Sequence, residues 1–387
     1  MKKFLPFIVV LGIIGFVLNS PVCGQKKSKK MHHDPHETID VRIVTGIPEI
    51  LSESSGIAVS HANSIWSHND AGNTNELFCF DTTGTIVRSL LILNATNVDW
   101  EDLTFDDQGR LYINDAGNNL NDRTDLKIYR IPDPETIVGT VAEAEIIEFI
   151  FEDQYQFPPP EPNLNFDIEA ILWHTDSLYL FTKNRSNPQN GICKMYRLPA
   201  LPGSHIARLT GSLFLGKSNK EARVTSADIN FETGEVLLLT NSKVVSLINY
   251  PFNNFFGGEI REFYFSDRLG QVEGVDFVDN NTLYLTEEAS KKSAGFLYEV
   301  HWQPASSVNH LQPTDLMIYP NPFTCQLKID SVFGSELEVD IWDIQGKFIE
   351  PLERTGNTFS LEHLKPGVYF VRVKLGNQSI VRRVVKY

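Results

Sequence analysis

The sequence has few of the residues that build disulfide or zinc frameworks. Only four of its 387 residues are cysteine. The three beyond the N-terminal segment, Cys79, Cys193 and Cys325, form an odd and scattered set that excludes a disulfide framework. Motifs of the C-x-x-C, H-E-x-x-H and G-x-S-x-G types are absent, as is a phosphate-binding glycine loop. No local motif therefore indicates zinc, serine-nucleophile or nucleotide chemistry.

Long apolar runs and positive charge are also scarce. The single long run, "FLPFIVVLGIIGFVL" after the basic start "MKK", is shorter than the roughly 20 residues of a membrane span. It predicts a signal peptide at residues 1–24, followed by a flexible leader at 25–40 and no later transmembrane segment. The net charge of −15 repels nucleic-acid phosphates. We therefore expect cations or neutral ligands, and no nucleic-acid partner.

Helical periodicity is missing from residues 41–303, where short alternating apolar runs are separated by Gly, Asn, Asp and Pro turns. This strand pattern repeats five times, beginning near residues 53, 99, 167, 225 and 271. The fifth repeat lacks a fourth strand, which residues 40–50 can supply by closing a ring. The sequence therefore predicts an all-β fold with a five-bladed β-propeller. A six-bladed ring is the alternative, because the interval from residue 101 to residue 169 is long.

In such a ring the first strand of each blade lines a central channel. Residues equidistant from a hairpin turn face each other across the two strands. Counting from the turns pairs Glu101 with Asp115, Glu169 with Lys183, Ala227 with Asn241, Glu273 with Glu287, and Ser55 with Asp70. We expect these five pairs to surround one mouth of the channel. The string NDAGN, which ends at Asn73 and again at Asn118, would form the loops there, its Gly taking a left-handed turn.

The expected ring is rich in carboxylates, which are the ligands that calcium prefers. We predict Glu101, Glu169 and Glu273 as metal ligands and Asp115 as a candidate catalytic base. The remaining polar positions predict ligand binding, and they are Asp70, Asn119, Arg123, Lys183, Asn241 and Glu287. No histidine falls in the ring, which argues against zinc. The alternative interpretation is that the repeated Glu residues are structural and bond the backbone of neighbouring blades.

The C-terminal residues 314–387 closely resemble the type IX secretion system C-terminal sorting domain. The resemblance is carried by Tyr319–Pro322, Asp343–Gly346, Gly367–Tyr369 and Arg382–Lys386. It implies a small β-sandwich that addresses the protein to the type IX secretion machinery, after which the protein is released or attached to the cell surface. Residues 304–313 would form the preceding linker.

Residues 45–303 are similar to secreted propellers distantly related to phytase-like and strictosidine-synthase-like or NHL-type propellers. Trp100–Asp102, Asp115–Asn119 with Arg123, and Ile128–Pro134 carry this resemblance. Some relatives bind calcium and hydrolyse phosphate or lactone esters, but they use basic or His residues, whereas the mouth expected here is acidic.

The sequence thus predicts an exported surface or secreted module, stabilised by calcium, that binds an extracellular glycan, peptide or protein. The alternative is a metal-dependent hydrolase acting on phosphoesters, esters or lactones at the channel mouth. The sequence alone does not decide whether the protein is an enzyme.

Overall fold

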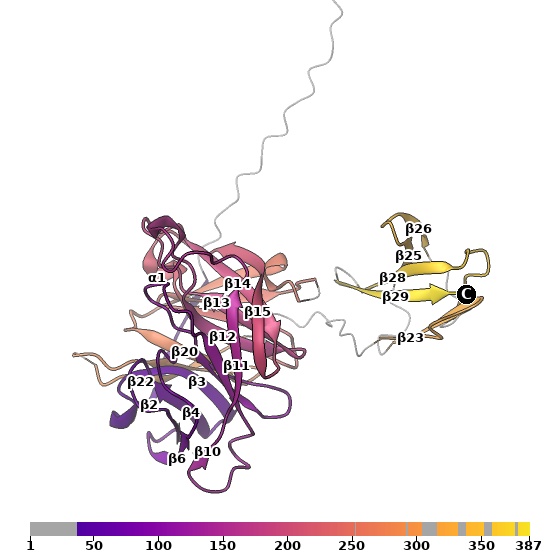
Figure 1. Ribbon diagram of the computed structural model, residues 1–387. Helices are drawn as coiled ribbons and strands as arrows, with labels where there is room; N and C mark the ends of the chain where they lie inside the picture. Colours follow the sequence, from indigo (N-terminus) through magenta and orange to yellow (C-terminus); the bar gives the residue numbers. More distant parts are fainter. Residues whose placement is uncertain are drawn as a thin grey trace, which may run out of the picture. The chain divides into compact units, whose positions relative to one another are not determined.

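The computed structural model describes residues 37–251, 253–291, 293–303, 316–331, 338–351, 358–375 and 378–387. The predicted signal peptide, most of the predicted leader and the predicted linker at 304–313 lie outside the described residues. An all-β body covers residues 37–303, and a smaller β domain begins at residue 316 (Figure 1). No helix in the described ranges is both long and apolar enough to cross a bilayer.

The body contains five antiparallel units of four strands within the described residues. The first strands are β3 (Ser54–His61), β7 (Leu103–Phe105), β12 (Ile168–His174), β16 (Val224–Ile229) and β20 (Val272–Asp279). The second are β4 (Ser64–Asn69), β8 (Leu111–Asp115), β13 (Ser177–Thr182), β17 (Val236–Thr240) and β21 (Thr282–Glu287). The third are β5 (Glu76–Phe80), β9 (Lys127–Ile131), β14 (Ile192–Pro199), β18 (Lys243–Ile248) and β22 (Phe296–His301). The fourth are β6 (Ile86–Ile92), β11 (Glu145–Phe151), β15 (Gly203–Phe214), β19 (Glu259–Phe265) and β2 (Arg42–Gly46).

The first strands contact one another in cyclic order, from β3 through β7, β12, β16 and β20 back to β3. The closing strand comes from the other end of the body, since β2 pairs antiparallel with β22. This is the closure that the missing fourth strand predicts. The body is therefore a closed, propeller-like ring of sheets, with short helical turns at η1 (Glu49–Leu51), η2 (Glu161–Asn163), η3 (Phe255–Gly257) and α1 (Asn219–Ala222).

The outer edges of the units carry pairings that the repeat pattern does not predict. β1 (Glu37–Ile39), which falls within the expected flexible leader, pairs parallel with β19. β10 (Val141–Ala142) pairs parallel with β6, and β11 pairs parallel with β15, which joins two units into one eight-stranded sheet. Between β11 and β12 the chain forms a loop with only the turn η2, and no additional strand. These pairings cover backbone groups that would otherwise be exposed sheet edges.

Hydrogen bonds accepted by one buried carboxylate join three units directly at the centre of the ring and reach a fourth through a serine. Asp102 is fully buried, and its Oδ2 accepts the backbone N–H groups of Ile171 at 3.0 Å and Ala227 at 3.1 Å. Its Oδ1 accepts the hydroxyl of Ser226 at 2.9 Å, and that hydroxyl accepts the N–H of Val275 at 3.1 Å. Asp102 therefore links its own unit to β12 and β16 and, through Ser226, to β20.

The C-terminal domain consists of two sheets that share one core. One sheet contains β23 (Leu316–Tyr319), β24 (Gln326–Ser331) and β27 (Thr358–Ser360). The other contains β26 (Phe348–Pro351), β25 (Glu338–Asp343), β28 (Gly367–Leu375) and β29 (Gln378–Lys386). Leu327 and Ile329 of the first sheet belong to the same buried cluster as Ile341 and Val371 of the second.

We expect Asp102→Ala to destabilise the body strongly. Three buried donors would lose their acceptor, and each buried unsatisfied donor costs about 1–3 kcal/mol. Urea unfolding should therefore show a loss of at least about 3 kcal/mol. Asp107→Ala is the matched control, because Asp107 is exposed in the turn that follows β7. Equal stability of the two variants would contradict a role for Asp102 in joining the units.

Candidate functional site

One cavity of about 220 Å³ receives side chains from all five units. Its walls come from the beginnings of the first strands and from the segments that follow the second strands. The residues that line it are polar without exception, and they are Ser55, Asp70, Glu101, Asn119, Glu169, Lys183, Arg185, Arg223, Asn241, Gln271 and Glu273. The cavity therefore lies at one mouth of the ring.

Most of the sequence-predicted site residues meet in this cavity. The three predicted metal ligands, Glu101, Glu169 and Glu273, all line it, and each is at least 95% buried. Four of the six predicted ligand-binding residues also line it, namely Asp70, Asn119, Lys183 and Asn241. The geometry thus brings these side chains together, while their roles stay predictions.

Three predicted site residues do not line the cavity. Asp115, the candidate base, accepts the N–H of Asp99 at 3.0 Å and the guanidinium of Arg123 at 3.2 Å. Arg123 is used in that contact and in a bond to the carbonyl of Gly117 at 2.7 Å. Glu287 accepts the hydroxyl of Tyr298 at 2.6 Å inside its own unit. Asp115, Arg123 and Glu287 therefore have structural partners, and the expected opposition of Glu273 and Glu287 is wrong.

A β-bulge explains why Glu287 lies opposite Val272 and not opposite Glu273, where counting from the hairpin turn places it. The pairing of β12 with β13 shifts between Ile168 and Ala170, so Glu169 is the extra residue of the bulge. The same shift occurs between Val224 and Ser226 and between Val272 and Gly274. The position equivalent to Glu169 in the fourth unit is consequently Thr225 rather than Ala227.

The structure also adds two arginines that the sequence analysis missed. Arg185 follows Lys183 by two residues, and Arg223 precedes β16, so both come from segments outside the paired strands. The two arginines add to Lys183, which the sequence already places at the acidic mouth. Arg185 could have been identified from the sequence, because it is a basic residue three positions after the end of β13.

Lys183 and Arg185 neutralise one side of the cavity. Lys183 Nζ lies 2.8 Å from Glu169 Oε2 and 3.9 Å from Glu273 Oε2. Arg185 binds the fully buried Asp167 at 2.5 Å and Glu169 at 2.7 Å. Burial opposes ionisation of Glu169, but the two cations outweigh burial and lower its pKa below the ordinary value.

On the opposite side, Glu101 and Asp99 have no ion pair among the described residues. Burial, reinforced by the charges of Glu169 and Asp70, raises the pKa of Glu101 well above its ordinary value. Burial and the charges of Asp167 and Asp70 raise the pKa of Asp99 to about 7. Burial is also the main reason that the pKa of Glu273 rises to about 7, and its Oε1 has no hydrogen-bond partner among the described residues.

Two sets of three carboxylates have ligand atoms within 4.8 Å of one another, which is the span of oxygens placed about 2.4 Å from one calcium ion. The first set is Asp70, Asp99 and Glu101. The second set is Glu101, Asp167 and Glu169, and two of its members already bind Arg185. Because no arginine or lysine of the described residues is paired with it, the first set fits a hard cation better than the second.

The two NDAGN loops use glycine for different reasons. Gly72 has φ of +76° with open space around it, as predicted for a left-handed turn. Gly117 is instead packed against the carboxylates of Glu101 and Asp99, where a Cβ atom would overlap both. The second copy therefore brings the backbone close to the carboxylates of the site.

Comparison with known families identifies the C-terminal domain of the chain. Residues 317–387 match the family model of the secretion system C-terminal sorting domain. A comparison of the chain with curated proteins finds no match.

Among solved structures, the chain is similar to PorZ, an essential surface component of the type IX secretion system of Porphyromonas gingivalis. The identity is 12% and the TM-score 0.31, and the similarity covers 86% of this chain and 45% of PorZ. The chain is also similar to PQQ-bound aldose sugar dehydrogenase of Streptomyces coelicolor, with 10% identity, a TM-score of 0.41, and coverage of 69% and 99%. It is similar as well to a gluconolactonase of Xanthomonas campestris. The identity is 10% and the TM-score 0.36, and the similarity covers 65% of this chain and 72% of the gluconolactonase.

The chain spans less than half the length of PorZ, and similarities as low as these carry no inference about activity. The match to the sorting domain is of a different kind, because it covers the whole C-terminal domain. Residues 317–387 are therefore a type IX secretion system C-terminal sorting domain, as the sequence predicts, and the chain is an exported protein of the cell surface or the surrounding medium.

Proposed function

We propose that the body is a five-bladed propeller, followed by a β-sandwich sorting domain, and that it works as an extracellular binding module. Its ligand is a small polar molecule held in the central cavity. The observation that carries this proposal is that all five units contribute polar side chains to one cavity of about 220 Å³. That volume is below the range typical of drug-sized pockets, so the ligand is small.

Calcium is the cation that best suits the first carboxylate set. Asp70, Asp99 and Glu101 offer only oxygen ligands, and no ion pair satisfies them among the described residues. The pKa of each is raised, chiefly by burial, which means that the folded protein holds three carboxylates that ionise unfavourably together. A bound calcium ion would stabilise the ionised form.

Arg223 indicates the chemistry of the small ligand. It lines the cavity, and the described residues contain no ion pair to its guanidinium, whose Nε donates only to the carbonyl of Asn184 at 3.3 Å. Amide side chains from Asn119, Asn241 and Gln271 surround the same space. An anionic group with neighbouring hydroxyls would satisfy the arginine and the amides together.

The calcium proposal predicts a stability that depends on both pH and calcium. Asp99 and Glu273 have pKa values of about 7 in the folded protein and near 4 in the unfolded chain. Between pH 4 and pH 7 the folded state therefore binds more protons than the unfolded state. Without calcium, the melting temperature should therefore fall as pH rises from about 4 to about 7. At pH 8, calcium at one hundred times its Kd should raise the melting temperature by about 5 °C.

At pH 5 the same calcium addition should have a smaller effect, because Asp99, whose pKa burial raises to about 7, is then protonated. Glu101→Gln should abolish the rise at pH 8, whereas the exposed control Asp107→Asn should retain it. A melting temperature at pH 8 that is identical with calcium and with chelator would remove the calcium proposal.

Arg223→Ala should weaken binding of small carboxylates such as acetate and lactate, titrated calorimetrically in calcium buffer. Loss of a charge-assisted hydrogen bond is expected to lower the affinity by about tenfold or more. Arg208→Ala is the control. Arg208 lies on the outer strand β15, pairs with Glu152, and does not line the cavity. If Arg223→Ala binds these anions as tightly as the unaltered protein, the ligand chemistry proposed here is wrong.

A hydrolase is the second candidate, favoured by one observation. Glu273 has a pKa near 7 and a free Oε1 at the cavity, which are the properties of a general base, whereas Asp115 is occupied by Arg123. A hydrolase would turn over p-nitrophenyl phosphate or a δ-lactone in a calcium-dependent way and lose at least about 100-fold in rate in Glu273→Gln. As a binding module, the protein should give no turnover above background with either substrate.

A further inference from the structure

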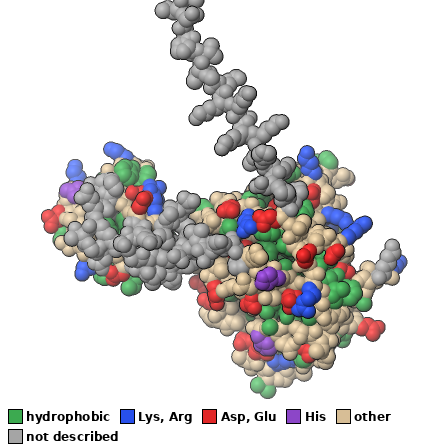
Figure 2. Space-filling model, turned by 180° about the vertical axis from the view of Figure 1, so that it is seen from behind, with side chains coloured by type: hydrophobic (Ala, Val, Ile, Leu, Met, Phe, Trp, Pro, Cys, Tyr) green, Lys and Arg blue, Asp and Glu red, His purple; other side chains and the backbone are tan. Residues whose placement is uncertain are grey.

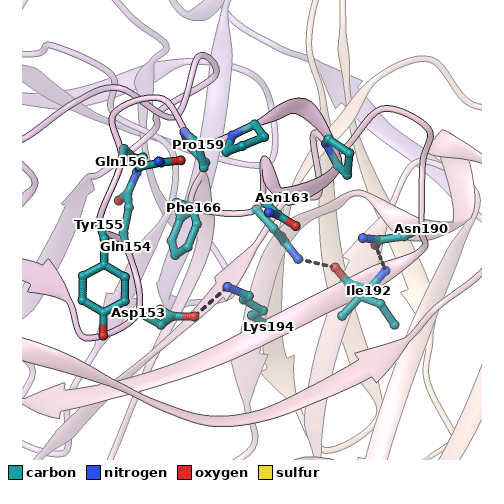
Figure 3. Close-up of a pocket in the computed structure, with 13 residues that line it drawn as sticks. Asp153, Gln154, Tyr155, Gln156, Pro159, Asn163, Phe166, Asn190, Ile192 and Lys194 are labelled. Carbon is teal, nitrogen blue, oxygen red and sulfur yellow. Dashed lines mark hydrogen bonds and ion pairs between the residues drawn. The ribbon is translucent and has the colours of Figure 1, made fainter.

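A second pocket, of about 490 Å³, lies beside the Pro-rich loop that connects β11 to β12. Figure 3 shows the loop residues Tyr155, Gln156 and Pro159 along one side and Asn190, Ile192 and Lys194 across from them. None of its lining residues lines the central cavity. The site is therefore separate from the one to which the proposed function refers.

The walls of this pocket combine aromatic and proline surfaces. Tyr155 stands at the rim with 84% of its surface exposed. The ring of Phe166 forms part of the wall and lies 4.0 Å from Lys194 Nζ. An exposed tyrosine beside a pocket offers a ligand a flat apolar face together with a polar hydroxyl.

The polar groups of the pocket are mainly side-chain amides. Gln154, Gln156, Asn163, Asn165 and Asn190 all line it. Each amide can donate and accept hydrogen bonds, as hydroxyl groups of a ligand also can. Asn165 is 96% buried and donates to the carbonyl of Ile192 at 2.9 Å, while its Oδ1 has no partner within the described parts of the chain.

The charged groups of the pocket neutralise each other. Lys194 Nζ lies 2.8 Å from Asp153 Oδ2, and the hydroxyl of Tyr196 donates to Asp153 Oδ1 at 2.9 Å. Neither charge is therefore left for a charged ligand. This pattern, with neutral amides around an aromatic face and no free charge, favours a neutral polyhydroxylated ligand over an anion or a cation.

The pocket is also held in shape before any ligand arrives. Gln154 donates to the carbonyl of Asn121 at 2.9 Å, and Asn187 donates to Glu161 at 2.7 Å across the base of the loop. Pro158, Pro159, Pro160 and Pro162 fix four backbone φ angles within the loop. A site of this kind loses little conformational entropy when it binds.

We propose that this pocket binds a neutral sugar residue, with the Tyr155 ring stacked on the apolar face of the sugar and the amides bonded to its hydroxyls. The occupant is a terminal or exposed unit of an extracellular glycan, because the rim at Tyr155 is open to solvent.

The test uses the full chain and four neutral probes, which are glucose, galactose, mannose and N-acetylglucosamine. Saturation-transfer NMR should show transfer to at least one of them, and Tyr155→Ala should weaken its binding by roughly fivefold. Asn163→Ala, on an exposed turn of the loop, should weaken it as well. Tyr387→Ala, a tyrosine that is 74% exposed in the sorting domain, is the matched control and should leave binding unchanged.

Glu101→Gln and calcium chelation should also leave sugar binding unchanged, which separates this site from the central cavity. Failure of all four sugars to bind would overturn the proposal. Equal binding by Tyr155→Ala and the unaltered protein would overturn it too, as would binding of a Pro-rich peptide or an anionic sugar at this pocket in preference to the neutral sugars.

Discussion

The burial of carboxylates along the axis of the ring is the constraint on which the rest of the body depends. Three aspartates in the deeper layer accept backbone N–H groups from neighbouring units: Asp102 as described above, Asp228 from Phe277 at 2.8 Å, and Asp276 from Val59 at 3.2 Å. Buried carboxylates are tolerated only when hydrogen-bonded, so these bonds set how closely the units approach.

Nearer the mouth of the ring, a second layer of carboxylates lines the central cavity. Glu101 precedes β7 and Glu273 is the second residue of β20, and both side chains line the cavity. The aspartates of the deeper layer make structural bonds between units, whereas a role of Glu101, Glu169 and Glu273 in metal binding stays a proposal. Lys183 and Arg185 compensate part of the negative charge at the mouth, and Glu101 is left without an ion pair among the described residues.

Much of this arrangement could be predicted from the sequence, because it depends on repetition and alternation. The five strand starts, the closure by β2 and the meeting of Glu101, Glu169 and Glu273 follow from these patterns. The bulge at Glu169 could not be counted in advance, since it inserts a residue without altering the turn. Arg223 and the parallel pairing of β11 with β15 depend on tertiary contacts between segments that share no local pattern.

The pairing of β2 with β22 has a consequence for biogenesis. Arg42 bonds Glu299 across 257 positions of sequence, so β2, near the start of the body, finds its partner only when β22 has been synthesised. Bringing such distant segments together carries a large entropic cost and slows folding. The ring can therefore close only after the whole of residues 37–303 has been synthesised.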